Sequence, residues 1–285
     1  RESRTDSSSP FLPGSGDFLT IGMKLPYYHV DVFANEVFKG NPAGVCLLEG
    51  DWLPDEVMQA MAAEHNLSET AFVLQKGEWF GLRWFTPAVE VDLCGHATIA
   101  TAHVLFNEVQ YGAHEIRFDT LSGEVGVSRS RGQLVLDFPS RPPKDFEPPS
   151  NLDQVLGSVA VERLASRDYF IVFPSEEVVR ALQPDFSAMQ EWDCLGVIVT
   201  APGDDPEVDF VSRFFAPRAG IDEDPATGSA HCTLIPYWAN RRGKINLRGL
   251  QISARGGEFF CRDSGERVRI GGNAKTYLRG EITLG

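Results

Sequence analysis

Two stretches of the sequence share one pattern. Residues 83–97 read RWFTPAVEVDLCGHA, and residues 213–230 read RFFAPRAGIDEDPATGSA. Each runs from an aromatic strand through a proline turn and an acidic residue to a glycine, which precedes a helix of small apolar residues. In this alignment Asp92 corresponds to Asp222 at an offset of 130 residues, and three residues are then inserted in the second copy. The repeat predicts a duplicated domain, because the offset is about half of the chain that follows Met23.

The rest of the chain alternates between strand patterns and a few helices. A helix is predicted at 54–65, where Pro54 suits the first helical position. The helices after the two glycines, 97–106 and 230–239, are apolar on nearly every face and must be buried. The sequence therefore predicts an α+β fold with two pseudo-symmetric domains, each a curved, mostly antiparallel sheet wrapped around a central helix. Strands are predicted at residues 25–33, 44–48, 70–74, 81–85, 115–120, 123–129 and 133–138.

Proline marks the boundary between the two halves. The segment PSRPPKDFEPPSN has five prolines in thirteen residues, so it can form neither a helix nor a central strand. We predict a first domain at 23–138, a linker at 139–149 and a second domain at 150–273, with 274–285 returning to the first. Residues 1–22 are rich in Ser, Gly and Pro and lack the apolar core of a signal peptide. They are predicted to be a disordered leader or an addition before a native start.

The composition limits the partners of the protein. Of its 285 residues, 26 are Lys or Arg and 40 are Asp or Glu, which gives a formal net charge of −14 at pH 7. This charge repels nucleic-acid phosphates and anionic membranes, so neither is a predicted partner. The sequence has no apolar run of the roughly 18 residues that a membrane span needs. The five cysteines are odd in number and lack a CxxC pair, which is typical of reduced thiols in the cytoplasm.

The starts of the two buried helices are candidate binding elements. A helix begins with backbone N–H groups that lack partners and with about half a positive charge. Gly95 and His96 on one side, and Thr227, Gly228 and Ser229 on the other, can therefore bind a small anionic metabolite through its carboxylate. The alternative is that Thr227 or Ser229 caps the second helix. The two interpretations are compatible.

Three ionisable residues lie beside these elements. Glu69 begins an apolar strand, where burial raises the pKa of a carboxyl group and suits it to general acid/base chemistry. The alternative for Glu69 is a capping or surface glutamate. His96 is a natural proton carrier near neutral pH. Asp224 either orients His96 or caps the second helix.

Signatures of metals and cofactors are missing from the sequence. His96 and His103 lie seven residues apart, but no Cys or carboxylate completes a set of zinc ligands with them. GxGxxG and Walker loops are absent, and none of the six lysines lies in an evident phosphate-binding loop. We therefore predict neither a metal nor a cofactor. Arg255, beside two glycines, is a weaker candidate for contacting the ligand.

Several blocks of the sequence together resemble the PhzF-like phenazine-biosynthesis family, and they follow the family's order. The resemblance implies the diaminopimelate epimerase-like fold, which has two similar domains, each with a sheet around a central helix. It also implies a homodimer. The blocks are DVF at 31–33, GNPA at 40–43, NLSETAF at 66–72, RWFTP at 83–87, CGHAT at 94–98, FAP at 215–217 and EDPATGSA at 223–230.

The resemblance also assigns roles to single residues. Glu69 matches the glutamate that moves a proton during isomerisation, and His96 and Asp224 match residues beside it. Gly228 and Ser229 match the segment that holds the substrate carboxylate. The leading hypothesis is therefore a cofactor-independent isomerase of a small carboxylated substrate, with Glu69 as the general acid/base.

Two alternatives stay open. One is a metabolite-binding or scaffold protein that keeps the fold without catalysis. The other is an epimerase or racemase that uses Cys94, which matches the first of two catalytic cysteines in related enzymes. A two-thiol mechanism is disfavoured because Pro225 and Ala226 stand where the second thiol belongs, although Cys232 lies one turn into the second helix.

Overall fold

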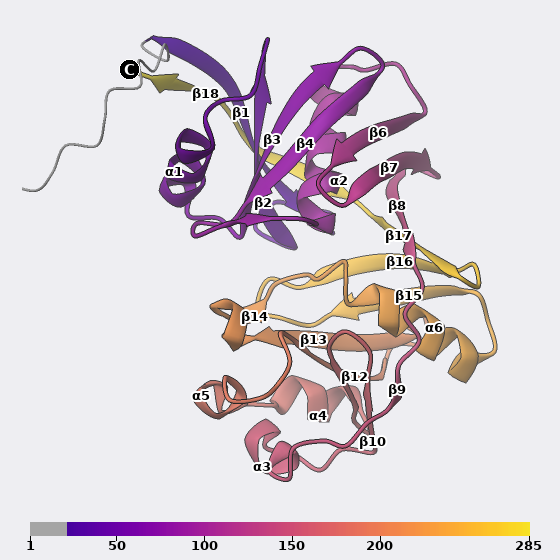
Figure 1. The fold of residues 1–285 in the computed structure, drawn as a ribbon. Helices are drawn as coiled ribbons and strands as arrows, with labels where there is room; N and C mark the ends of the chain where they lie inside the picture. Colours follow the sequence, from indigo (N-terminus) through magenta and orange to yellow (C-terminus); the bar gives the residue numbers. More distant parts are fainter. Residues whose placement is uncertain (1–21) are drawn as a thin grey trace, which may run out of the picture.

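The computed structural model describes residues 22–285. The predicted leader, residues 1–22, lies outside the described residues except for Gly22. Figure 1 displays two lobes, and the last strand, β18, runs back from the lower lobe to the upper one. We call β1–β8 with β18 the first lobe and β9–β17 the second lobe.

The first lobe follows the predicted order of strands and helices. Its central helix α2 starts two residues earlier than predicted and continues into a π-helix, η1. Pro54 is the N-cap of α1 and not its first residue. The elements are β1 (Met23–Val32), β2 (Asn41–Leu48), α1 (Asp55–His65), β3 (Glu69–Lys76), β4 (Trp79–Phe85), β5 (Glu90–Val91), α2 (Gly95–His103), η1 (Val104–Glu108), β6 (Glu115–Thr120), β7 (Gly123–Ser130) and β8 (Gln133–Pro139).

The second lobe has the same plan, with additional short helices. The elements are β9 (Lys144–Asp145), α3 (Leu152–Leu156), β10 (Glu162–Ala165), β11 (Tyr169–Val172), α4 (Glu176–Ala181), α5 (Phe186–Met189), β12 (Val197–Pro202), β13 (Phe210–Ala216), the 3₁₀ turn η2 (Pro217–Ala219), β14 (Ile221–Asp224), α6 (His231–Arg242), β15 (Asn246–Gln251), β16 (Gly257–Asp263) and β17 (Arg267–Gly272). The chain then enters β18 (Ala274–Leu284).

Strand pairing repeats from one lobe to the other. In the first lobe β1–β2 is antiparallel, β2–β3 parallel, β3–β4 antiparallel and β4–β6 parallel, and β6, β7 and β8 follow as antiparallel neighbours. In the second lobe β10–β11, β11–β12, β12–β13, β13–β15, β15–β16 and β16–β17 have the same directions in the same order. This agreement confirms the predicted duplication and the α+β class with mostly antiparallel sheets.

The end strands connect the two lobes. β8 and β17 occupy equivalent places in the two lobes and pair with each other, with Leu136 opposite Ile270. After β8 the chain forms β9, which pairs with β10, and after β17 it forms β18, which pairs with β1 along its full length. Each lobe therefore receives one strand from the segment that follows the other lobe's last strand. The predicted domain boundaries at 23–138, 139–149 and 150–273 stay a prediction.

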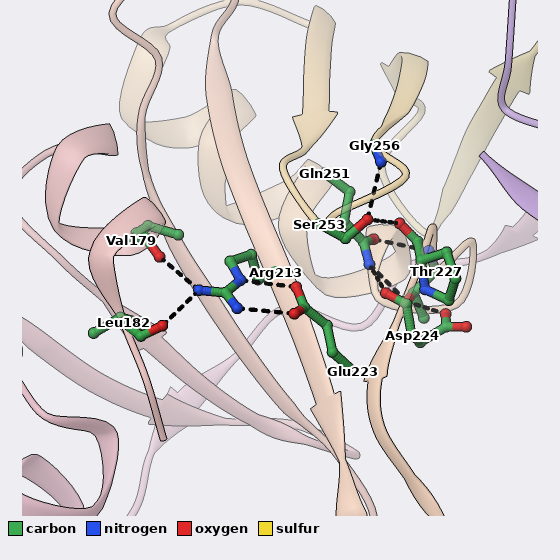
Figure 2. A network of polar contacts seen from close by, with 10 residues as sticks. Val179, Leu182, Arg213, Glu223, Asp224, Thr227, Gln251, Ser253 and Gly256 are labelled. Carbon is green, nitrogen blue, oxygen red and sulfur yellow. Dashed lines mark hydrogen bonds and ion pairs between the residues drawn. The ribbon is translucent and has the colours of Figure 1, made fainter. Parts of the chain in front are cut away.

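An arginine–glutamate ion pair that occurs in both lobes fixes how the two repeats align. Phe85 lies opposite Glu90 in one hairpin, and Phe215 lies opposite Glu223 in the other. In each case the glutamate accepts two hydrogen bonds from an arginine two residues before the phenylalanine, at 2.7 Å in the first lobe and 2.8 Å in the second. Figure 2 shows the second of these pairs, with Arg213. Glu90 and Glu223 are therefore equivalent, and the offset between the two copies at these residues is 133 and not 130.

This register corrects the sequence alignment. The three extra residues lie in the turn at η2, before β14, and not after Asp222 as predicted. The equivalence of Asp92 with Asp222 was therefore wrong. The sequence alignment placed the insertion wrongly because it relied on a single matching aspartate in a short acidic run. In the structure, the backbone hydrogen bonds of the paired strands set the register.

The two central helices are buried as predicted. Seven of the nine α2 residues are buried, from His96 to Ala102. Thr98 and Thr101 tolerate this position because their hydroxyls donate to the carbonyls of Cys94 and Ala97, at 2.6 and 2.8 Å. Seven residues of α6 are buried as well, and both helices belong to one apolar core. None of the helices in residues 22–285 has the length and hydropathy of a membrane span.

Gly40 lies in a tightly packed turn of the first lobe that also contacts the second lobe. Its φ is +64°, a Cβ at this position would lie 1.9 Å from the carbonyl oxygen of Val32, and its N–H donates to Gly256 of the second lobe at 2.8 Å. We predict that Gly40→Ala lowers the free energy of unfolding by about 3 kcal/mol or more. Gly50 has φ +79° but open space around it, so Gly50→Ala should cost only about 1 kcal/mol. Equal losses in urea titrations would contradict the predicted clash between a Cβ at residue 40 and the Val32 carbonyl.

Candidate active site

Three side chains from β3 and the start of α2 converge. His96 Nε2 lies 3.1 Å from Glu69 Oε2, and His96 Nδ1 lies 3.6 Å from Cys94 Sγ. Cys94 and His96 are each 6% exposed, and the Glu69 side chain is 17% exposed. The structure thus brings the predicted pair of Glu69 and His96 together. It adds Cys94, so the imidazole lies between a carboxylate and a thiol.

The charges of this group depend on its burial. Burial by itself would lower the pKa of His96, but Cys94 and Glu69 raise that pKa well above its usual value. Burial raises the pKa of the Cys94 thiol, and the Glu69 carboxylate raises it further. The directions of these two shifts favour a protonated His96 imidazole and a neutral Cys94 thiol near neutral pH.

Asp224 reaches the same group from the end of β14 in the second lobe. Its Oδ1 accepts a hydrogen bond from Asn41 Nδ2 at 2.9 Å, and its Oδ2 accepts one from the Thr227 hydroxyl. Burial raises the pKa of Asp224 and Glu69 adds to the effect, while His96 lowers it. The charge of His96 thus acts on Asp224. The sequence predicted that Asp224 either orients His96 or caps α6. Within residues 22–285, Asp224 makes no hydrogen bond to His96 and caps no N–H of α6.

The turn before α6 holds the other predicted binding residues. The Thr227 N–H donates to Gln251 Oε1 at 2.8 Å, and its hydroxyl donates to Asp224. Thr227 therefore does not cap α6, which begins at His231. Within the described chain, the N–H groups of Gly228 and Ser229 have no hydrogen-bond partner. These groups remain available for an anion.

The start of α2 is similar. The N–H groups of Gly95 and His96 also lack hydrogen-bond partners among residues 22–285, and the N-cap residue Cys94 makes no capping bond with its side chain. A Cβ on Gly95 would contact the apolar side chains of Leu136 and Phe138 at 3.4 to 3.5 Å. Its missing side chain therefore faces the core, so the close approach of a ligand does not by itself explain this glycine.

Two amides that the sequence analysis missed hold the site together. Asn41 is fully buried in the first lobe and donates to Asp224 Oδ1 and to the Ala226 carbonyl, at 2.9 and 3.0 Å. Gln251 is 1% exposed and donates to the Asp224 carbonyl at 2.6 Å. Figure 2 shows Gln251 and Ser253 next to the turn around Thr227. Asn41 belongs to the GNPA block, which could have marked it, but no sequence pattern pointed to Gln251.

His231 supports the same turn through a hydrogen bond from its side chain. Its Nδ1–H donates to the Thr227 carbonyl at 2.9 Å, and its ring stacks on Phe259 with centroids 3.7 Å apart. Thr98 makes the equivalent contact in the first lobe, to the Cys94 carbonyl. Burial lowers the pKa of His231 to about 4. The ring is therefore neutral near pH 7 and serves as a fixed donor.

Other sequence candidates have structural roles. Arg255 donates to Asp31 at 2.6 Å and to the Gly40 carbonyl at 2.8 Å, so it joins the lobes. His103 Nε2 contacts Thr276 Oγ1 at 3.0 Å, away from His96. The sequence argument against a metal considered only His96 with His103. The structure places Glu69 and Cys94 beside His96 instead.

Comparisons with known proteins agree with this architecture. A family model described as phenazine biosynthesis-like protein matches residues 30–280. An uncharacterized isomerase from Pseudomonas aeruginosa is 52% identical over 263 residues, covering 92% of this chain and all of that protein. A PhzF-family crystal structure from Enterococcus faecalis superposes with a TM-score of 0.89 at 49% identity, covering 92% of this chain and all of the other. A predicted epimerase from Pseudomonas aeruginosa shares the fold, with a TM-score of 0.71 at 19% identity, covering 92% of this chain and all of that one.

Asn41 should contribute more to the free energy of unfolding than Asn35, which bridges the lobes at the surface. Asn41→Ala leaves the buried Asp224 without one of its donors, so we predict a loss of about 2 kcal/mol in the free energy of unfolding. Asn35 also bridges the lobes, from its Nδ2 to Glu258 at 2.5 Å, but it is exposed. Asn35→Ala should therefore cost less than about 0.5 kcal/mol. Chemical denaturation of both variants at pH 7 measures the difference, and similar losses would argue against the bridge.

His231 predicts a pH dependence of stability. With a folded pKa of about 4 and an unfolded value of about 6.5, the unfolded chain binds the extra proton first as the pH falls. Stability from this group is complete above about pH 6.5 and is lost toward pH 4, by up to about 3 kcal/mol. His231→Gln should flatten the stability curve in this range, leaving the slope from His103, whose pKa burial also lowers to about 4. An unchanged slope relative to a variant at the exposed His114 would refute the assignment.

Proposed function

This chain belongs to the phenazine biosynthesis-like family, and from that premise we propose that it is an isomerase that moves a proton on a small carboxylated substrate. Glu69 is the proposed general acid/base. The observation that carries the proposal is the 3.1 Å contact between Glu69 and His96, beside two helix starts with free N–H groups. The name of the relative from Pseudomonas aeruginosa, an uncharacterized isomerase, supports the same reaction class.

The proposed chemistry uses groups of this chain. Glu69 takes a proton from a substrate carbon next to a conjugated system and returns it at another carbon. His96 contacts the Glu69 carboxyl group at 3.1 Å and keeps it in place before the transfer. The free N–H groups of Gly95, His96, Gly228 and Ser229 bind the substrate carboxylate and the negative charge that develops. A protein of net charge −14 needs such short-range donors to hold an anion.

Asp224 has a positioning role in this proposal. It joins Asn41 of the first lobe to Thr227 of the second, so it fixes the turn whose N–H groups face the substrate. The proposal needs neither a metal nor a cofactor.

The cysteine-dependent alternative receives less support from the geometry. A two-thiol racemase requires one thiol on each face of the substrate. The charges that act on Cys94 come from Glu69 and His96, whereas those that act on Cys232 come from Arg141, Arg167 and Asp168. The two thiols therefore have different surroundings, and both are buried.

Two further expectations complete the proposal. The family resemblance favours a homodimer, which sedimentation equilibrium would measure. The cysteines are all free in the structure, including three beyond the pair just discussed, which is compatible with a cytoplasmic location.

Glu69→Gln tests the proposal directly. We predict that the wild-type protein exchanges a substrate C–H with deuterium from D₂O in a panel of unsaturated carboxylic acids, measured by mass spectrometry. The variant should lower that exchange rate at least about 100-fold, because an amide cannot accept the proton. Its melting temperature should change little. Glu64, exposed at the end of α1, provides the matched control Glu64→Gln.

The same assay separates the alternatives. Undiminished exchange in Glu69→Gln would rule out Glu69 as the acid/base. Loss of exchange in Cys94→Ala together with full activity in Glu69→Gln would favour the cysteine mechanism. A panel member that raises the melting temperature but is never altered would favour a binding protein.

A further inference from the structure

We propose that Glu69, Cys94 and His96 form a binding site for one Zn²⁺ ion, and that the bound ion inhibits the protein. The inhibition rests on the proposed function, because it acts on the same carboxylate. The binding itself does not depend on any reaction.

The three residues provide the right kinds of ligand. Zn²⁺ binds thiolate sulfur, imidazole nitrogen and carboxylate oxygen, usually in a tetrahedron. One such atom from each of the three residues lies within 4.8 Å of the other two. The 3.6 Å between Cys94 Sγ and His96 Nδ1 is already about the separation of two ligands on one zinc ion. A single ion takes only one imidazole nitrogen, so the Glu69 side chain must move by about 1 Å or more to join it.

Two of the potential ligand atoms lack partners in the structure. Glu69 Oε2 and His96 Nε2 are buried, and neither makes an aligned hydrogen bond within residues 22–285, despite their 3.1 Å contact. Buried polar atoms without partners are costly. Coordination gives Glu69 Oε2 a strong partner, whereas His96 Nε2 stays outside the coordination sphere, because His96 Nδ1 is the nitrogen that lies next to Cys94.

Binding exchanges protons for the metal. The Cys94 thiol and the His96 imidazolium each release one proton to solvent, and the ion takes the thiolate, the neutral imidazole and the Glu69 carboxylate as ligands. Affinity should therefore rise with pH. Once coordinated, Glu69 cannot accept a proton from a substrate, which accounts for the inhibition.

The surroundings favour a soft divalent cation. A net charge of −14 attracts cations at long range, as it repels the anionic substrate. The sulfur and nitrogen ligands select Zn²⁺ over Mg²⁺ or Ca²⁺, which prefer oxygen. Three protein ligands leave a fourth position for water.

Cobalt(II) is the direct probe. Metal-free, reduced, full-length protein is titrated with Co²⁺, and the near-ultraviolet charge-transfer band between thiolate and cobalt is recorded. We expect one equivalent to produce the band and one equivalent of Zn²⁺ to remove it. Cys94→Ser should abolish the band and weaken Zn²⁺ binding at least 10-fold. Cys261→Ser, at another buried cysteine, should keep both.

A second variant covers the case in which Cys94→Ser fails to fold. His96→Gln keeps the thiol, so it should retain a weakened band, with Zn²⁺ affinity again lowered at least 10-fold. Absence of a thiolate band in the wild-type protein, or its persistence in folded Cys94→Ser, would overturn the site.

The inhibition is tested separately by deuterium exchange. Saturating Zn²⁺ should suppress wild-type exchange, and EDTA should restore it. A cobalt band without any loss of exchange under Zn²⁺ would overturn the inhibition. If Glu69→Gln retained exchange while the cobalt band was present, the proposed function would fail and the metal site would stand.

Discussion

Burial of two helices without a polar face is the constraint on which this fold depends. α2 and α6 are apolar around most of their circumference, so each requires a sheet that surrounds it. The two sheets have the same strand order and meet through β8 and β17. The chain closes this arrangement by giving β9 to one lobe and β18 to the other. The buried residues of α6 include its first turn, and the candidate site lies where the two central helices begin.

The candidate site consists of hydrogen-bonded supporting residues around central polar groups that lack hydrogen-bond partners within residues 22–285. Its supporting bonds are buried and mostly complete: Asn41 and Gln251 hold Asp224 and Thr227 from opposite lobes. At the centre, Glu69 and His96 are close but not aligned, and backbone N–H groups at both helix starts lack partners among residues 22–285. A protein tolerates such unpaired buried groups at functional sites, where a ligand supplies the missing contacts. The same group of side chains forms the proposed Zn²⁺ site.

Much of the fold followed from local patterns, and the exceptions have physical causes. The strands of the first lobe, the buried helices and the duplication were visible because alternation and apolar runs are local properties. The site pair of Glu69 and His96 was predicted, although its chemistry stays a proposal. The alignment of Asp92 with Asp222 failed because strand register, and not residue identity, decides equivalence. Gln251 and Cys94 were missed as partners, because their contacts come from residues distant in sequence or from a side-chain direction that no spacing reveals.

The sequence by itself determined the family and the α+β class, and it singled out the residues that we propose for acid/base chemistry. This was possible because motifs and hydrophobic periodicity are local properties of the sequence. Only the tertiary structure decided which of those residues meet. Glu69 comes from β3, His96 and Cys94 from the start of α2, and Asp224 from the other lobe. Their approach depends on how two sheets close around two helices, and that packing is a property of the whole chain.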